Sequence, residues 1–339
     1  MTSAAISAQA QLHHQYFLGL QLMVAVEESK QTVYDWMFQL FRRQHEDKFL
    51  SSFEKLGLDH EPDAVACAKY HVLSNGIGGV AVEYMPESET KAWVRFRYPR
   101  WMYAGPAICG IPVEASRGFL HGWYAQNGVS LNNPRLGFVC VSEDVTGQFG
   151  LCGYFKEYDH DLSEAERLVF ARDERPPAFD PTAQPEPPAR DWSEERLAKA
   201  NRNYAMEYVR NGLAALANVI GVDRTRAQAS KAARLTGLQN YQEMRAAIDV
   251  PEGDAQQSAR FLTEMMRGMG DECAVSNAEN GGVTITQTGL RIARGLDGET
   301  RELLLTCWAE LWRGAIHAQR SFLDVECQIE ADRIVWQVR

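Results

Sequence analysis

Residues 72–82 read VLSNGIGGVAV, and residues 274–285 read AVSNAENGGVTI. Both stretches contain Ser-Asn, a short gap and Gly-Gly-Val, so each is interpreted as a strand, a glycine turn and a second strand. Downstream, residues 119–126 (FLHGWYAQ) have a counterpart in residues 312–319 (WRGAIHAQ), with a one-residue slip at Ala-Gln. Because these matches occur in the same order, they predict a tandem duplication of one module.

Each module is predicted to contain N-terminal helices, a β-hairpin, a helix and a second β-hairpin, which is an α+β fold and not a doubly wound α/β fold. Apolar residues recur at helical spacing in residues 5–56, 194–220, 224–248 and 256–269. The final hairpins are expected at residues 136–142 with 150–156 and at residues 323–329 with 334–339. Ser163 and Glu166 have capping-box spacing, so a helix is also expected over residues 168–170.

A proline-rich segment divides the chain. Residues 173–191 read DERPPAFDPTAQPEPPARD and contain six of the 13 prolines. Proline fixes φ and removes a backbone donor, so this segment is expected to be an extended connector. The predicted organisation is a first module at residues 1–172, a linker at residues 173–191 and a second module at residues 192–339.

Composition excludes several classes of function. The 339 residues suit two domains, and a net charge of −10 disfavours nucleic acid and anionic lipid as partners while leaving small molecules open. We identify no stretch of about 20 apolar residues for a membrane span and no charged region typical of a secretory signal, so a cytoplasmic protein is expected. The seven cysteines have no CxxC spacing, which predicts reduced thiols rather than a zinc site or disulfides.

Strong catalytic motifs are absent from the sequence. We find no GxSxG elbow, phosphate-binding loop, HExxH or GxGxxG. No organic cofactor is predicted and no metal ligand is assigned, and whether a metal is bound stays open. Glu157 and His160 have ExxH spacing, but no second such motif accompanies them.

An arginine- and aromatic-rich strand is the first candidate binding region. Residues 93–101 read WVRFRYPRW, and alternation places Arg95 and Arg97 on one strand face. Guanidinium groups bind carboxylates, so the candidate substrate-binding residues are Arg95, Arg97, Tyr98, Trp101 and Trp123. The alternative is a solvated face in which these arginines pair with Glu83, Glu87 and Glu89.

A helix provides the candidate acid–base pair. Glu114 and His121 are seven residues apart and share a helix face, although about 10.5 Å of rise separates them. Glu310 and His317 repeat this spacing. The alternative is that each histidine is a hydrogen-bonded structural residue.

Cys140 and Cys152 are the candidate nucleophiles, since the hairpin pattern brings them nearly opposite one another. A thiolate needs a cation or base nearby, which His121 or Arg97 would supply. The alternative is two inert buried thiols.

Three of these segments together resemble a known family. Residues 94–99, the helix through His121 and residues 150–155 (GLCGYF) are similar to the C-terminal pattern of the L-2-amino-thiazoline-4-carboxylic acid hydrolase family, and 4-vinyl-reductase-type ligand-binding domains share the layout. The resemblance implies a hydrolase that opens a small carboxylated heterocycle at a C–N bond, with Cys152 or Cys140 as nucleophile or ligand.

Two other functions stay open. One is a non-enzymatic sensor whose pocket binds a small molecule, and the other is an assembly subunit without a pocket. Homo-oligomerisation is compatible with either function. The sequence leaves open which substrate is used and which module carries the site.

Overall fold

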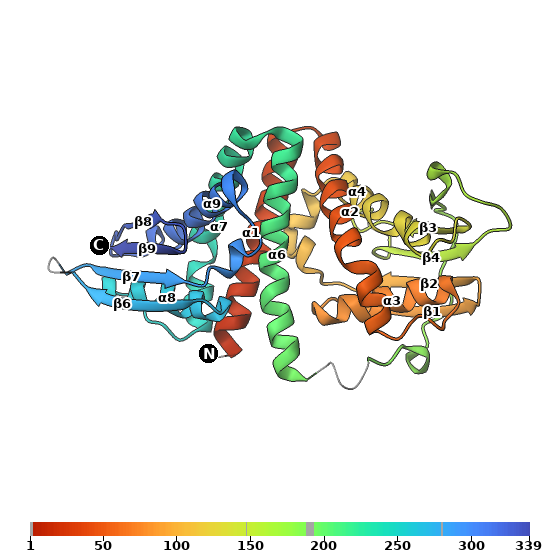
Figure 1. The fold of residues 1–339 in the computed structure, drawn as a ribbon, viewed down its shortest axis with the longest axis horizontal. Helices are drawn as coiled ribbons and strands as arrows, with labels where there is room; N and C mark the ends of the chain where they lie inside the picture. The colour runs from red at the N-terminus through yellow and green to blue at the C-terminus, as the bar shows by residue number, and fades with distance from the viewer. Residues whose placement is uncertain (1–2, 147, 188–192, 279–280) are drawn as a thin grey trace. The chain divides into compact units, whose positions relative to one another are not determined.

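The computed structural model describes residues 3–146, 148–187, 193–278 and 281–339 (Figure 1). The chain forms two compact units. We name Ala25–Leu197 the central unit, and we name the chain N-terminal to Ala25 together with Ala198–Arg339 the terminal unit. No helix in the described ranges combines the length and the apolar character that a membrane crossing requires.

The central unit contains a five-stranded sheet with the strand order β1-β2-β4-β3-β5. Helices α3 and α4 and the inner face of this sheet enclose its main core, in which Val94, Phe138 and Phe155 are buried. Its elements are α2 (Lys30–Lys55), α3 (Asp63–Ile77), β1 (Val82–Ser88), β2 (Lys91–Phe96), α4 (Val113–Gly122), α5 (Asn127–Ser130), β3 (Leu136–Ser142), β4 (Cys152–Glu157) and β5 (Leu168–Phe170).

The terminal unit contains a four-stranded antiparallel sheet with the strand order β6-β7-β9-β8. Its inner face buries Ile285, Ile334 and Trp336. Its elements are α1 (Ser3–Glu27, of which the part up to Val24 belongs here), α6 (Glu194–Ile220), α7 (Val222–Ala247), α8 (Ala255–Met269), β6 (Glu272–Asn277), β7 (Val283–Thr288), α9 (Gly298–His317), β8 (Val325–Ile329) and β9 (Arg333–Val338).

The α+β fold class is confirmed. Each unit has the order helix, hairpin, helix, hairpin, and the order β1-β2-β4-β3 in one sheet corresponds to β6-β7-β9-β8 in the other. An origin of the two units by duplication stays a prediction.

Two predicted elements are wrong. Residues 72–77 form the last turns of α3 and not a strand, because the apolar face of Ala66, Tyr70 and Leu73 packs into the core at helical spacing. Residues 168–170 form β5, which pairs in parallel with β3, and the predicted capping box instead begins a short 3-10 helix at Glu164–Glu166. Sheet pairing therefore prevails over the local helix signal.

Helix α1 packs with the terminal unit, although the predicted first module began at residue 1. The Tyr16 hydroxyl donates to the Ala229 carbonyl of α7 at 3.1 Å. Trp308 Nε1 of α9 donates to His13 Nε2 at 3.0 Å. These contacts with residues more than 200 positions away make the terminal unit discontinuous in sequence.

The linker is anchored to the central unit. The Gln184 amide accepts from Tyr84 N at 2.9 Å and donates to Tyr84 O at 2.8 Å. Tyr84 lies on β1, an edge strand of the sheet. The side chain of Gln184 therefore satisfies backbone groups that an edge strand would otherwise expose.

Candidate functional site

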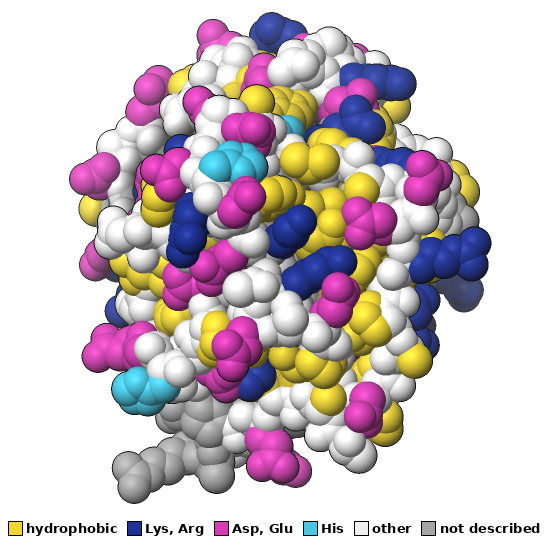
Figure 2. All heavy atoms as spheres, turned by 90° about the vertical axis from the view of Figure 1, so that its right-hand side faces the viewer, with side chains coloured by type: hydrophobic (Ala, Val, Ile, Leu, Met, Phe, Trp, Pro, Cys, Tyr) yellow, Lys and Arg dark blue, Asp and Glu magenta, His cyan; other side chains and the backbone are white. Residues whose placement is uncertain are grey.

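The two predicted anchoring arginines are held by one carboxylate. Arg97 Nη1 lies 3.0 Å from Glu83 Oε1, and Arg95 Nη1 lies 3.9 Å from Glu83 Oε2. Figure 2 shows the face of the molecule on which the five-stranded sheet of the central unit lies, and basic side chains are interspersed with acidic ones there. The alternative interpretation, a solvated face paired with Glu83, describes this geometry.

Tyr98, which is 41% exposed, donates to a polar cluster whose other members are buried. Its hydroxyl donates to the Asp144 carbonyl at 2.6 Å, and Arg100 Nη1 lies 2.5 Å from Asp144 Oδ1. Ser116 Oγ donates to Asp144 Oδ2 at 3.1 Å. Arg100 is therefore paired with a buried carboxylate, as in a structural ion pair, while its Nε has no hydrogen-bond partner in the described part of the chain. The side chain of Trp101 lies outside the described residues.

Glu114 and His121 both lie on α4, with no hydrogen bond between them in the described structure. His121 Nδ1 bonds to the Arg117 carbonyl at 3.1 Å, and burial lowers the pKa of the imidazole. Glu114 Oε2 and Trp123 Nε1 are buried without a hydrogen-bond partner in the described part of the chain. The predicted acid–base pair is thus on one helix but not assembled.

The two candidate thiols lie on opposite faces of the sheet, so the expectation that they lie nearly opposite one another is wrong. Cys140 pairs in register with Gly153, and a bulge then places Ser142 opposite Cys152. Cys140 belongs to the inner core and Cys152 to the outer apolar cluster with Trp93. Burial raises the pKa of each thiol to about 12, which disfavours a thiolate.

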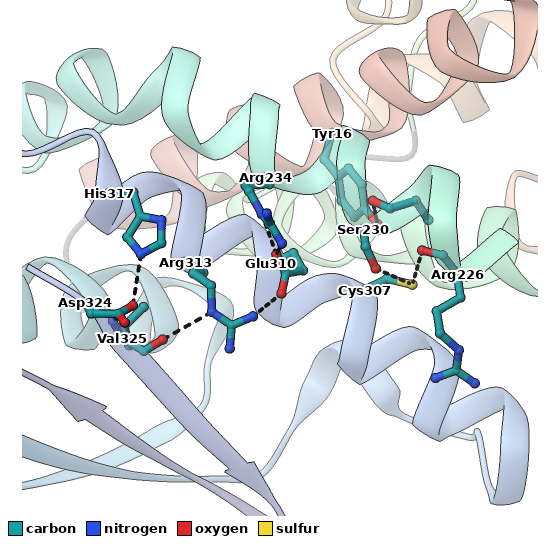
Figure 3. A network of polar contacts seen from close by, with 11 residues as sticks. Tyr16, Arg226, Ser230, Arg234, Cys307, Glu310, Arg313, His317, Asp324 and Val325 are labelled. Carbon is teal, nitrogen blue, oxygen red and sulfur yellow. Dashed lines mark hydrogen bonds and ion pairs between the residues drawn. The ribbon is translucent and has the colours of Figure 1, made fainter. Parts of the chain in front are cut away.

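Glu310 and His317 are likewise separate, as Figure 3 shows. Glu310 pairs with Arg234 of α7 and with Arg313 of its own helix. His317 Nε2 lies 2.9 Å from Asp324 Oδ1. This network joins α7, α9 and the start of β8, and its groups already satisfy one another.

Sequence reasoning missed a buried relay in the central unit. Arg42 Nη1 lies 3.4 Å from His45 Nδ1, His45 Nε2 lies 3.1 Å from Asn127 Oδ1, and Asn127 Nδ2 lies 3.1 Å from His71 Nε2. A guanidinium can only donate, so His45 Nδ1 accepts and its Nε2–H donates to Asn127. The Asn127 amide in turn donates to His71. Burial lowers the pKa of both imidazoles, so both are neutral.

An open, positively charged pocket lies in the terminal unit. We name it the arginine pocket, and its volume of about 380 Å³ is within the range of small-molecule sites. One wall is a face of α6 and the other is the loop between β7 and α9. The lining residues are Asn203, Met206, Glu207, Arg210, Arg291, Arg294 and Gly295.

A buried carboxylate positions the loop side of the arginine pocket. Asp271 Oδ1 accepts from Arg291 N at 3.0 Å, and Asp271 Oδ2 accepts from Gln287 Nε2 at 2.7 Å. Trp336 Nε1 fixes Gln287 by donating to its Oε1 at 2.9 Å. Burial raises the pKa of Asp271 to about 6, although these hydrogen bonds and nearby arginines oppose the shift.

The arginines of the loop keep donors for a ligand. Arg291 uses its Nε–H toward the Gly270 carbonyl at 3.1 Å. Arg294 is exposed, and its side chain makes no hydrogen bond or ion pair within the described residues. With Arg210 and one carboxylate, that of Glu207, the lining has an excess of positive charge. Such a lining suits a carboxylate, phosphate or sulfonate group.

The sequence contains one signal for this pocket, the spacing RIARG at residues 291–295. The residues that complete it come from α6, some 80 positions earlier, and only the fold brings them together. No group of three or more His, Cys, Asp or Glu side chains in the described ranges is arranged to hold a metal ion.

Comparisons with known proteins give no relative: no family model, no curated protein and no solved structure matches the chain.

Proposed function

We propose that the protein is a small-molecule-binding module that holds an anionic ligand in the arginine pocket. The observation that carries the proposal is Arg294, an exposed guanidinium on the lining that has no partner in the described structure. Elsewhere on the chain, Arg95, Arg97 and Arg100 are already paired with carboxylates. This proposal corresponds to the sensor function that the sequence left open, and the cytoplasmic location expected from sequence is part of it.

Chemistry and size define the ligand class. Guanidinium groups form bidentate bonds with carboxylate and phosphate oxygens, and Met206 adds an apolar contact. Asn203 and Glu207 offer polar partners to a hydroxyl or amino group. We therefore expect a compact anion with a small polar or apolar body, rather than a nucleic acid or a lipid.

Calorimetric titration of the intact protein with carboxylates, phosphate monoesters and sulfonates tests the proposal. The Arg294→Gln variant should bind the best anion at least about tenfold more weakly, because it loses a charged bidentate donor. Arg320→Gln is the matched control, since Arg320 is 93% exposed outside the pocket and its ion pair with Glu252 is long, at 3.8 Å. Equal binding by the wild type and Arg294→Gln, or no binding of any anion, would refute the proposal.

C–N bond hydrolysis, which the family resemblance implies, is a second hypothesis. The buried and unpartnered Glu114 Oε2 favours it, since unsatisfied buried polar groups often have a functional role. The high thiol pKa values and the separation of Cys140 from Cys152 weigh against it. A hydrolysis assay tests this hypothesis, with carboxylated thiazolines and cyclic amides as substrates and with the wild type, Cys140→Ala, Cys152→Ala and Glu114→Gln as enzymes. Turnover that none of the substitutions lowers contradicts the assigned residues.

A further inference from the structure

Strand β6 leaves one edge of the terminal sheet unpaired. Ala278 N donates to Gly282 O at 2.9 Å across the β6–β7 hairpin. Antiparallel strands alternate the direction of their backbone groups, so those of Cys273, Val275 and Asn277 point away from β7. Among them, Cys273 O accepts one long bond, 3.4 Å from Arg267 Nη2.

This edge lacks the protection that its counterpart has. In the central unit, Gln184 covers the backbone of edge strand β1, and in the terminal unit we find no such cover on β6 among the described residues. Val275 is 48% exposed, although its cross-strand neighbour Ile285 on the same face is fully buried. Strand β6 also contains no Lys, Arg or Pro, the residues that commonly discourage edge pairing.

Helix α8 runs antiparallel along β6, as the lower part of Figure 1 shows. Gln256 Nε2, near the start of the helix, donates to Asn277 Oδ1 at 2.8 Å, whereas Arg267, near its end, reaches Cys273 O. Gln256 and Arg267 are eleven positions apart, which is a helical rise of about 16.5 Å. Cys273 and Asn277 are four positions apart, which is about 14 Å along a strand. Helix and strand therefore form one surface of matched length.

Two opposite charges occupy the middle of this surface. Arg260 and Glu264 lie between Gln256 and Arg267 at steps of three or four residues, so all four share a helix face. Arg260 is exposed, and its side chain has no ion pair or hydrogen bond within the described residues. Glu264 pairs with Arg267 at 3.3 Å on a partly exposed face.

We propose that β6 pairs antiparallel with β6 of a second copy of this chain, about a two-fold axis through Val275. This register uses all three outward residues of each strand: Val275 faces Val275, and Cys273 faces Asn277 of the other copy. It provides six backbone hydrogen bonds, covers both exposed valines and joins the two sheets into one.

The same axis brings the helices into complementary positions. Because the axis exchanges the Cys273 and Asn277 ends of β6, it exchanges the Arg267 and Gln256 ends of α8. Arg260 then lies opposite Glu264 of the second copy, and the pair occurs twice. Self-complementary charge and backbone pairing are what an isologous two-fold interface requires.

Sedimentation equilibrium of the full chain tests this dimer. We expect a reversible monomer–dimer equilibrium whose dissociation constant rises at least about tenfold in Arg260→Glu and in Glu264→Arg. The double variant should return to within about threefold of the wild type, because it restores the opposite-charge pairs. Both side chains are on the surface, so the rescue separates the interface from misfolding.

A charged residue on the edge provides an independent test. Val275→Lys places two lysines opposite each other across the axis, and it should weaken the dimer at least about tenfold. Gln328→Lys adds the same charge at an exposed position of β8, the other edge strand of this sheet, and should leave the dimer unchanged. A wild-type chain that is monomeric throughout, or a dimer indifferent to Val275→Lys and to the charge exchange, overturns the proposal.

Discussion

At the scale of single residues, the buried imidazoles predict acid lability. Burial, followed by the charge of Arg42, lowers the pKa of His45 to about 4, against 6.5 for the unperturbed group. The folded state therefore favours neutral His45. Its contribution to the free energy of unfolding is present above pH 6.5 and is lost as the pH falls toward 4. From these values, His45 alone should lower the free energy of unfolding by about 2 kcal/mol between pH 7 and pH 4.5.

Urea unfolding at the two pH values measures this effect. His45→Gln keeps a donor for Asn127 and an acceptor for Arg42 but does not titrate, so its loss of stability should be about 2 kcal/mol smaller than that of the wild type. The exposed His60 provides the control variant, His60→Gln, which should behave as the wild type. An unchanged pH dependence in His45→Gln would show that His45 is not the titrating group.

A second residue, Asp271, predicts pH-dependent binding in the arginine pocket. Its pKa of about 6 leaves the carboxyl neutral below pH 6 and ionised above it. The ionised form opposes the field of Arg291 and Arg202, so an anion should bind more tightly as pH falls through 6. Sulfate remains a dianion over this range and is the appropriate probe.

The expected result is several-fold tighter sulfate binding at pH 5 than at pH 7.5, measured by calorimetry. Asp271→Asn should flatten this dependence, whereas Glu272→Gln, which removes an exposed neighbouring carboxylate, should preserve it. Sulfate binding that is equal at both pH values contradicts the coupling alone. The absence of sulfate binding would instead count against the pocket.

The residue scale also shows the limit of sequence reasoning about the site. Alternation predicted that Arg95 and Arg97 share a strand face, but whether they are free depends on Glu83 of β1, which lies beside both. Local spacing likewise placed Cys140 and Cys152 on adjacent strands, and only the strand register, which sets Cys140 opposite Gly153, decides that the two thiols face opposite sides.

At the scale of elements, close helix crossings depend on glycine in both units. A Cβ on Gly122 of α4 would lie 2.6 Å from the Phe38 carbonyl of α2. A Cβ on Gly314 of α9 would lie still closer to the Arg234 carbonyl of α7. Each glycine lies on the helix between the two hairpins of its unit, whereas an origin of the two units by duplication stays a prediction.

Gly122→Ala should therefore destabilise the central unit, although alanine is the better helix former. Overpacking against backbone costs about 1–3 kcal/mol. The gain in helix propensity is only about 1 kcal/mol, so a cost in the upper part of that range gives a net loss of stability. Chemical denaturation measures the change, with the exposed Gln39→Ala of α2 as control. A stabilised Gly122→Ala would show that the helices separate at little cost.

Elements were predictable where local pattern and tertiary packing agree. The final hairpins and the helices α7 and α8 lie close to their predicted bounds, and Gly221 separates α6 from α7 as expected. Residues 72–77 were misassigned because Ser-Asn lies in the last turns of α3 here but in strand β6 in the second half. Residues 168–170 are too few to distinguish a helix from a strand without knowledge of β3.

At the scale of the whole chain, the sequence could not reveal that α1 belongs to the terminal unit. The proline-rich segment lies within the range of the central unit, with residues 188–191 outside the described residues, and helix α1 precedes the central unit but packs with the other one. The relevant partners, His13 with Trp308 and Phe17 with Tyr208, are about 190 to 300 positions apart in the chain. No periodicity or composition signal records a pairing at that distance.

Removing the chain up to Val24 should accordingly unfold the terminal unit and spare the central one. The deletion uncovers Trp308 and leaves its Nε1 without His13, and it removes Phe17 from Tyr208. The lost burial costs several kcal/mol of stabilising free energy, which is comparable with the whole stability of a typical domain. Amide hydrogen exchange should show at least about a hundredfold loss of protection in β6 to β9, with protection in β1 to β4 retained as the internal control. Equal loss in both sheets would mean that the two units fold as one, and retained protection in β6 to β9 would mean that α1 is dispensable to the terminal core.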